Sequence, residues 1–216
     1  MIKAVIFDLD GTLTDTLDSI KISGDKMAEK FGMGPYSKEQ YKLFVGDGAE
    51  KLVERCLIAG GDEKLTHFNE AYEEYKKIFE EYCMYRVEPY DGITELLSAL
   101  KAKDVKTAVL SNKPHDRTCE VIFSIFGKES FHVVQGQTEG IRRKPSPEGV
   151  FHIMDKLGLK PDEILYLGDT GTDMQTGKAA GVFTIGALWG FREKKELLEN
   201  HSDAIIKNPL QLLDYL

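Results

Sequence analysis

Six short apolar runs, separated by helical patterns, constrain the fold of this chain more than any other feature of its sequence. Each run is three or four residues long and is rich in β-branched or aromatic side chains. Runs of this kind that alternate with helices are typical of buried strands in a mostly parallel, doubly wound α/β sheet. The predicted strands are residues 4–7, 107–110, 132–134, 164–167, 182–185 and 204–206, with helices at 93–103, 117–126, 149–157 and 174–180.

One long segment, residues 15–87, interrupts this alternation because it contains no convincing strand. Several helical patterns replace it, including aromatic residues that recur every three or four positions between Phe68 and Tyr82. We therefore predict an all-helical domain at 15–87, inserted into an α/β core made of residues 1–14 and 88–216.

Composition narrows the classes of partner. The chain has 216 residues and a formal net charge of −8, which disfavours nonspecific binding to nucleic acids or membranes, since both are polyanions. Its three cysteines include no CxxC pair, and its N-terminal apolar run is short and is cut by Asp8 and Asp10. We expect reduced thiols, a cytoplasmic location and a monomer or weak homodimer.

Two carboxylates, Asp8 and Asp10, follow the first predicted strand directly. Side chains two residues apart in extended backbone point to the same side, and ligands of open α/β sheets bind at the carboxyl ends of strands. Their mutual repulsion favours a bound cation, because repulsion otherwise raises one pKa. The alternative is a solvated Asp-Gly turn without catalytic function.

A second acidic pair, Asp169 and Asp173, follows another predicted strand. Carboxylate oxygens suit Mg²⁺, which binds one or two carboxylates together with substrate phosphate and water. The alternative for Asp173 is a cap of the helix that follows.

Polar residues also occur at the ends of two further predicted elements. Ser111 ends a strand and could donate a hydrogen bond to a phosphoryl oxygen, although an ordinary turn would also explain it. Lys144 precedes two prolines that restrict its loop, which favours a phosphate ligand over a solvated surface lysine.

These four segments, taken together and in order, resemble the four motifs of the haloacid-dehalogenase superfamily of hydrolases. The resemblance implies a phosphatase in which Asp8 attacks phosphorus to form an aspartyl-phosphate and Asp10 acts as general acid and base. It also implies Mg²⁺ as cofactor and a small phosphorylated metabolite as substrate. The implied Mg²⁺ ligands are Asp8, the main-chain carbonyl of Asp10 and Asp169, supported by Asp173; the implied phosphoryl ligands are Ser111, Asn112 and Lys144.

The inserted segment is similar to the helical cap of the subfamily that includes phosphoglycolate phosphatases and β-phosphoglucomutases. Residues 44–55 resemble the cap segment of phosphoglycolate phosphatases, except that Asp47 stands where that family commonly has Asn. Gly46 and Gly48 precede a helix whose N-terminus suits an anion, and Arg55 on that helix would strengthen this preference, so we predict that the three residues bind substrate. A small substrate with a carboxylate opposite its phosphate would fit, and the likeness implies 2-phosphoglycolate. An alternative for Asp47 is that it caps the following helix.

The charges of the four motif aspartates sum to −4 when all are ionised, and Mg²⁺ with Lys144 contributes +3. The remaining charge of −1 would be removed if Asp10 were protonated. Other reactions on the same scaffold remain open: a sugar-phosphate phosphatase or phosphoglucomutase, a nucleotidase or a pyrophosphatase. A signalling module that stores phosphate on Asp, or a non-catalytic binding protein, are alternatives of another class. A dinucleotide-binding enzyme is disfavoured because no GxGxxG follows the first strand.

Overall fold

The computed structural model describes all residues, 1–216, and the chain divides into two compact units. Met1–Asp15 and Glu88–Leu216 form an α/β unit, and Thr16–Val87 form a helical unit. The predicted boundaries, 14/15 and 87/88, lie within one residue of these. That the helical unit acts as a cap stays a prediction.

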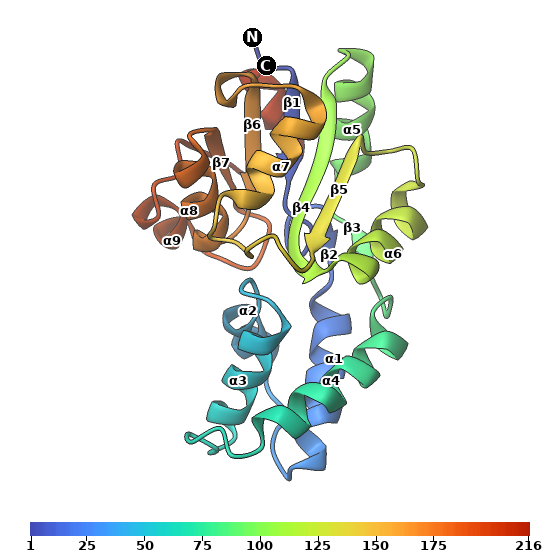
Figure 1. The fold of residues 1–216 in the computed structure, drawn as a ribbon, viewed down its shortest axis with the longest axis vertical. Helices are drawn as coiled ribbons and strands as arrows, with labels where there is room; N and C mark the ends of the chain where they lie inside the picture. Colours follow the sequence, from blue (N-terminus) through green and yellow to red (C-terminus); the bar gives the residue numbers. More distant parts are fainter. The chain divides into compact units, whose positions relative to one another are not determined.

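The α/β unit is built on a six-stranded sheet in the order β5-β4-β1-β6-β7-β8, in which every neighbouring pair is parallel (Figure 1). All six predicted strands are present, and the predicted fold class is confirmed. The strands are β1 (Ala4–Phe7), β4 (Lys106–Pro114), β5 (Val133–Gln137), β6 (Ile164–Gly168), β7 (Phe183–Ala187) and β8 (Ala204–Ile206).

Apolar side chains on both faces of this sheet explain why its strands read as continuous hydrophobic runs. One face packs Ile6, Leu110 and Tyr166 against Val150 and Ile153 of a helix. On the other face Phe7 meets Phe131 edge to face. The helices of this unit are α5 (Ile93–Ala102), α6 (His115–Phe126), α7 (Glu148–Leu157), α8 (Gly171–Ala180) and α9 (Lys194–Glu199), with 3₁₀ turns η1 (Pro161–Glu163) and η2 (Pro209–Tyr215).

The helical unit consists of α1 (Leu17–Lys30), α2 (Lys38–Phe44), α3 (Ala49–Ala59) and α4 (Phe68–Tyr82). A capping box opens α2: the Ser37 side chain accepts a hydrogen bond from the Gln40 N–H, and the Gln40 side chain accepts one from the Ser37 N–H. The aromatic row of α4 is partly buried, with Tyr75 stacked on Phe79. No helix of the protein has the length and apolarity that crossing a membrane requires.

A two-stranded ribbon that the sequence did not predict lies where the chain leaves and re-enters the α/β unit. Its strands, β2 (Thr14–Asp15) and β3 (Glu88–Pro89), are antiparallel. Two residues are too few to show the alternation from which a strand is recognised. The ribbon joins the two ends of the insertion inside the α/β unit.

Helix α8, which carries Asp173, approaches strand β7 so closely that a glycine is required between them. A Cβ atom on Gly177 would lie 2.0 Å from Thr184 Oγ1 and 2.9 Å from Thr184 Cγ2. Both residues are buried, so neither can move into solvent. The glycine therefore sets the distance between α8 and the sheet.

We expect Gly177→Ala to lower the free energy of unfolding by about 1–3 kcal/mol, the usual cost of overpacking a core. This loss would exceed the ~1 kcal/mol that alanine gains over glycine in a helix. Urea unfolding followed by the fluorescence of the single tryptophan, Trp189, measures the change. The same substitution should cost less in a Thr184→Ala background, and an unchanged midpoint in the wild-type background would contradict the prediction.

Candidate active site

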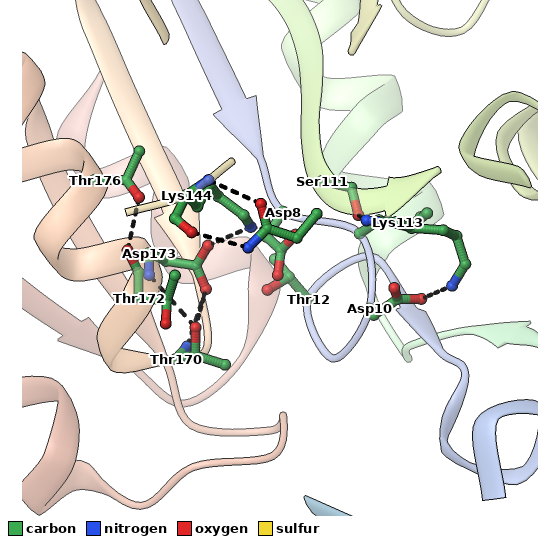
Figure 2. Close-up of polar contacts among 12 residues, drawn as sticks. Asp8, Asp10, Thr12, Ser111, Lys113, Lys144, Thr170, Thr172, Asp173 and Thr176 are labelled. Atoms are coloured by element: carbon green, nitrogen blue, oxygen red, sulfur yellow. Dashed lines mark hydrogen bonds and ion pairs between the residues drawn. The ribbon is translucent and has the colours of Figure 1, made fainter. Parts of the chain in front are cut away.

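The polar ends of three neighbouring strands meet at one edge of the sheet. Asp8 follows β1 directly, Ser111 lies in the last part of β4, and Asp169 follows β6. Strand β1 lies between β4 and β6, and all three run parallel, so their carboxyl ends share an edge. Figure 2 shows the side chains of Asp8, Lys144 and Asp173 gathered at this edge.

Lys144 connects two of the buried carboxylates. Its Nζ lies 2.7 Å from Asp8 Oδ1 and 2.7 Å from Asp173 Oδ1, and its side chain is only 3% exposed. Burial disfavours the charge on Lys144, but Asp173 and Asp8 outweigh it and raise its pKa. Burial and then Asp173 raise the pKa of Asp8 well above its ordinary value, against the opposing effect of Lys144. An unscreened negative charge on Asp8 is therefore costly without a further cation.

The Asn112 side chain holds the backbone of Lys144 in place. Its Oδ1 accepts from the Lys144 N–H (2.8 Å), and its Nδ2 donates to the Lys144 carbonyl (3.1 Å). The resemblance implied that Asn112 contacts the phosphoryl group. The structure places its side-chain amide on the main chain of the lysine, where it supplies one acceptor and one donor. The contact of Asn112 with the phosphoryl group stays a prediction.

Asp169 accepts hydrogen bonds on both of its oxygens. The Thr12 hydroxyl donates to Oδ1 (3.0 Å), and the Phe191 N–H donates to Oδ2 (2.7 Å). Burial and the charge of Asp173 raise the pKa of Asp169 to about 7, against the lowering effect of these two bonds. The Trp189 Nε1–H in turn donates to the Thr12 carbonyl (3.0 Å), so the segment after β7 is joined to the first motif.

Two glycines allow the backbone to approach Asp169. Gly11 has φ of +91°, and a Cβ there would lie 2.3 Å from Asp169 Oδ2. A Cβ on Gly190 would lie 2.3 Å from the Gly11 carbonyl oxygen. Sequence reasoning missed Thr12 and Phe191 as partners of Asp169, although the glycines beside them were a signal of close backbone packing.

Asp173 takes part in the cap of a helix and also belongs to the acidic cluster, and its support of a metal ion stays a prediction. Its N–H and side chain form a capping box with Thr170 at the start of α8. Its Oδ2 accepts from the Thr170 N–H (3.1 Å) and hydroxyl (2.7 Å), and its Oδ1 accepts from the Tyr166 hydroxyl (2.9 Å) as well as from Lys144. With both oxygens engaged, Asp173 is held rigidly.

The donor set fits a divalent cation. Asp8, Asp169 and Asp173 each offer one carboxylate oxygen, and these atoms lie within 4.8 Å of one another. Three carboxylates and the Lys144 ammonium sum to −2 when all are charged, so one Mg²⁺ would bring the buried cluster to neutrality. Oxygen atoms are the ligands that Mg²⁺ prefers. The Asp10 side chain is outside this cluster, as expected for a residue whose implied ligand is its carbonyl.

Asp10 forms an ion pair that the sequence analysis did not predict. Lys113 Nζ lies 2.5 Å from Asp10 Oδ1, and the Lys113 N–H donates to Ser111 Oγ (3.1 Å). The charge count made from the sequence omitted this lysine, and including it raises the sum from −1 to zero. A surplus of negative charge is thus no longer a reason for Asp10 to be protonated. The signal was the position of Lys113 two residues after Ser111 in one strand.

The predicted substrate-binding residues Gly46, Gly48 and Arg55 lie in the helical unit. Arg55 Nη1 donates to the Phe44 carbonyl (2.8 Å), and Nη2 donates to Asp47 Oδ2. Gly48, with φ of +90°, is the N-cap of α3. The Asp47 carboxylate pairs with Arg55, whose guanidinium also donates to the Leu43 and Phe44 carbonyls. That Asp47 caps this helix as well stays an alternative.

Comparisons with known proteins bear on this site. A phosphoglycolate phosphatase of Aquifex aeolicus is 32% identical over 190 residues, which cover 88% of this chain and 86% of that protein. An N-acetylmuramic acid 6-phosphate phosphatase of Pseudomonas aeruginosa is 30% identical over 217 residues, covering 100% and 95%. A solved structure from Lactobacillus delbrueckii subsp. bulgaricus, a candidate phosphoglycolate phosphatase, has a TM-score of 0.93 and 29% identity. The match covers 99% of this chain and 97% of that protein.

The enzyme class predicted from the sequence, a phosphoric monoester hydrolase, is confirmed by these relatives, which disfavours the signalling and non-catalytic alternatives. The family model described as haloacid dehalogenase-like hydrolase matches residues 5–187, which include all four motifs and most of the chain. This chain therefore belongs to the haloacid dehalogenase-like hydrolases.

Proposed function

We propose that this enzyme is a Mg²⁺-dependent phosphomonoester hydrolase in which Asp8 is the nucleophile and 2-phosphoglycolate is the substrate. The observation that carries the proposal is the buried cluster in which Lys144 bridges Asp8 and Asp173, with Asp169 beside them. A carboxylate held against an ammonium at the edge where sheets bind ligands is suited to attack a phosphoryl group.

In the first step a carboxylate oxygen of Asp8 forms a bond to phosphorus while the bond from phosphorus to the ester oxygen breaks. Asp10 gives a proton to the departing oxygen, which leaves as an alcohol. The Ser111 oxygen already accepts the Lys113 N–H, so its own hydrogen can be donated to a phosphoryl oxygen. Lys144 balances the charge of the nucleophile and of the transferred group.

In the second step water attacks the aspartyl-phosphate. The water oxygen bonds to phosphorus, its proton passes to Asp10, and the bond between phosphorus and Asp8 breaks, which restores the carboxylate and releases inorganic phosphate. Asp8, Asp169 and the Asp10 carbonyl would hold Mg²⁺, with Asp173 supporting them, and the bound ion would neutralise charge on the phosphoryl oxygens. Asn112 acts by positioning Lys144.

The choice of substrate rests on the helical unit and on the relatives. The helix α3 begins at Gly48, which has no side chain, and a helix N-terminus favours an anion such as a carboxylate. Arg55 shapes the preceding loop through the Phe44 carbonyl and Asp47, which replaces direct substrate binding as its proposed role. The substrates in the names of these two relatives, phosphoglycolate and N-acetylmuramic acid 6-phosphate, are both phosphate esters that also carry a carboxylic acid.

A second candidate substrate is N-acetylmuramic acid 6-phosphate. It is favoured by the relative of that name, which aligns with the entire chain at 30% identity. The two candidates differ in size, so a comparison of their rates separates them. A cytoplasmic location and a monomer or weak homodimer stay predictions.

For the nucleophile, we expect Asp8→Asn to fold and to lose activity by on the order of 10³-fold or more, because an amide cannot form the acyl-phosphate. Asp10→Asn should trap a phosphoryl adduct on Asp8 when an activated aryl phosphate is supplied, since the base for its hydrolysis is gone. Acid quenching and mass spectrometry of the Asp8 peptide detect the adduct. Substantial steady turnover by Asp8→Asn would contradict the mechanism.

For the metal, we expect chelation to abolish turnover and added Mg²⁺ to restore it. Asp169→Asn should weaken Mg²⁺ binding by about 10-fold or more, because one anionic ligand is lost from a buried site. Calorimetric titration of the protein with Mg²⁺ measures affinity without relying on activity. Undiminished activity in excess chelator would remove the ion from the mechanism.

For the substrate, we expect kcat/KM for 2-phosphoglycolate to exceed that for glucose 6-phosphate and AMP by about tenfold or more, which corresponds to ~1.4 kcal/mol of transition-state binding. Arg55→Ala should reduce this preference while sparing p-nitrophenyl phosphate. Lys51→Ala is the matched control, because Lys51 lies on the same helix but pairs with Glu54. Faster turnover of N-acetylmuramic acid 6-phosphate would favour the second candidate, and equal rates for all would remove both.

A further inference from the structure

The ion pair between Lys113 and Asp10 is a largely buried charge interaction at the site that the proposed mechanism does not use. The Lys113 side chain is 3% exposed and that of Asp10 is 20% exposed. Figure 2 shows the lysine extending from strand β4 to reach Asp10, apart from the Lys144 cluster. The two residues are 103 positions apart in the sequence.

Stability alone does not explain this pair. Removing a lysine from water is costly, and replacing a buried ion pair by apolar side chains is often neutral or stabilising. Lys113 is nonetheless held at both ends of its residue: its N–H donates to Ser111 Oγ, and its carbonyl accepts from the Thr118 hydroxyl (3.2 Å). The backbone of Lys113 is thus braced by Ser111, a proposed phosphoryl ligand, and by helix α6.

We propose that Lys113 is a positioning residue that fixes the Asp10 carboxyl group by occupying Oδ1, so that Oδ2 is the oxygen that exchanges the proton. This inference rests on the proposed function, because it assigns an orientation to its general acid and base. A carboxyl group that can rotate offers either oxygen to the reaction. One charge-assisted hydrogen bond to Oδ1 ties that oxygen to β4 and leaves the other to face the substrate.

The proton then follows one route in both steps. When the ester bond breaks, the proton on Asp10 Oδ2 moves to the departing alkoxide oxygen, and Lys113 stabilises the carboxylate that remains. When water attacks the aspartyl-phosphate, its proton moves to the same Oδ2 as the new bond from oxygen to phosphorus forms. The ammonium of Lys113 keeps its protons throughout, so no group outside the proposed mechanism is needed.

The test uses the dependence of rate on the leaving group. An alkoxide needs a proton as it departs, whereas p-nitrophenolate is stable as an anion and leaves without one. We expect Lys113→Met to lower kcat/KM for the best alkyl phosphate by about 100-fold, which is within the range of general acid catalysis. The same variant should lower kcat/KM for p-nitrophenyl phosphate by at most about 10-fold. Because kcat/KM ends at the first irreversible step, hydrolysis of the aspartyl-phosphate does not affect this comparison.

Lys106→Met is the matched control. Lys106 begins the same strand, and its Nζ donates to the Leu157 carbonyl (3.2 Å) at the other end of β4. It should leave the ratio of the two substrates unchanged. Lys113→Gln is the second variant, since glutamine can still donate to Oδ1 without a charge; it should fall between wild type and Lys113→Met, and it keeps the test available if the methionine variant does not fold.

A double variant separates failure of this inference from failure of the proposed function. If Lys113 acts through Asp10, adding Lys113→Met to Asp10→Asn should change kcat/KM by less than about threefold, because the two residues act as one unit. Equal losses of kcat/KM on both substrates, or losses that multiply in the double variant, would overturn the positioning role. Lys113 would then act on the phosphoryl group or serve only to stabilise the fold. If Asp10→Asn itself showed no leaving-group dependence, the proposed acid would be wrong.

Discussion

The structure depends on keeping three carboxylates and one ammonium together out of water. Asp8, Asp169, Asp173 and Lys144 are all buried, and every oxygen that Asp169 and Asp173 present is already hydrogen-bonded within the protein. Buried charges are tolerated only when they are paired and hydrogen-bonded. Burial, followed by the charge of Asp173, raises the pKa values of Asp8 and Asp169. The cluster carries −2 when fully ionised, so a divalent cation fits it.

This constraint accounts for features of the fold that lie outside the reacting groups. Gly11 and Gly190 have no side chains because the backbone must reach Asp169, and Gly168 has none because a Cβ there would lie 2.3 Å from the Asp173 Cβ. Gly177 similarly lets α8 seat Asp173 against the sheet. The amide of Asn112 is used on the Lys144 main chain for the same reason, since a misplaced lysine would leave two buried carboxylates unpaired.

The sequence was sufficient to predict the strands and the edge where the site lies, because strand runs, strand ends and their acidic residues are local patterns. It was not sufficient to predict which side chains pair. Lys113 meets Asp10 across 103 residues, and Phe191 meets Asp169 through a main-chain N–H that no residue type reveals. Arg55 was predicted to bind substrate because it is a cation on the helix whose N-terminus follows Gly46 and Gly48. The sequence did not show that the loop before this helix also provides the guanidinium with acceptors. The β2–β3 ribbon escaped prediction because its strands are two residues long.

The distribution of polar partners agrees with the proposal that selectivity lies in the helical unit. In the α/β unit, Lys144 and Lys113 pair with carboxylates of the site, and Asn112 holds the main chain of Lys144. In the proposed mechanism these residues act on the phosphoryl group and not on the rest of the ester. The loop before α3 is braced separately, by Arg55 on Asp47 and on the Phe44 carbonyl. Its shape can therefore change without disturbing the buried charges on which catalysis relies. If selectivity lies in the helical unit as proposed, one charged core could serve esters as different as the two in the relatives' names, phosphoglycolate and N-acetylmuramic acid 6-phosphate.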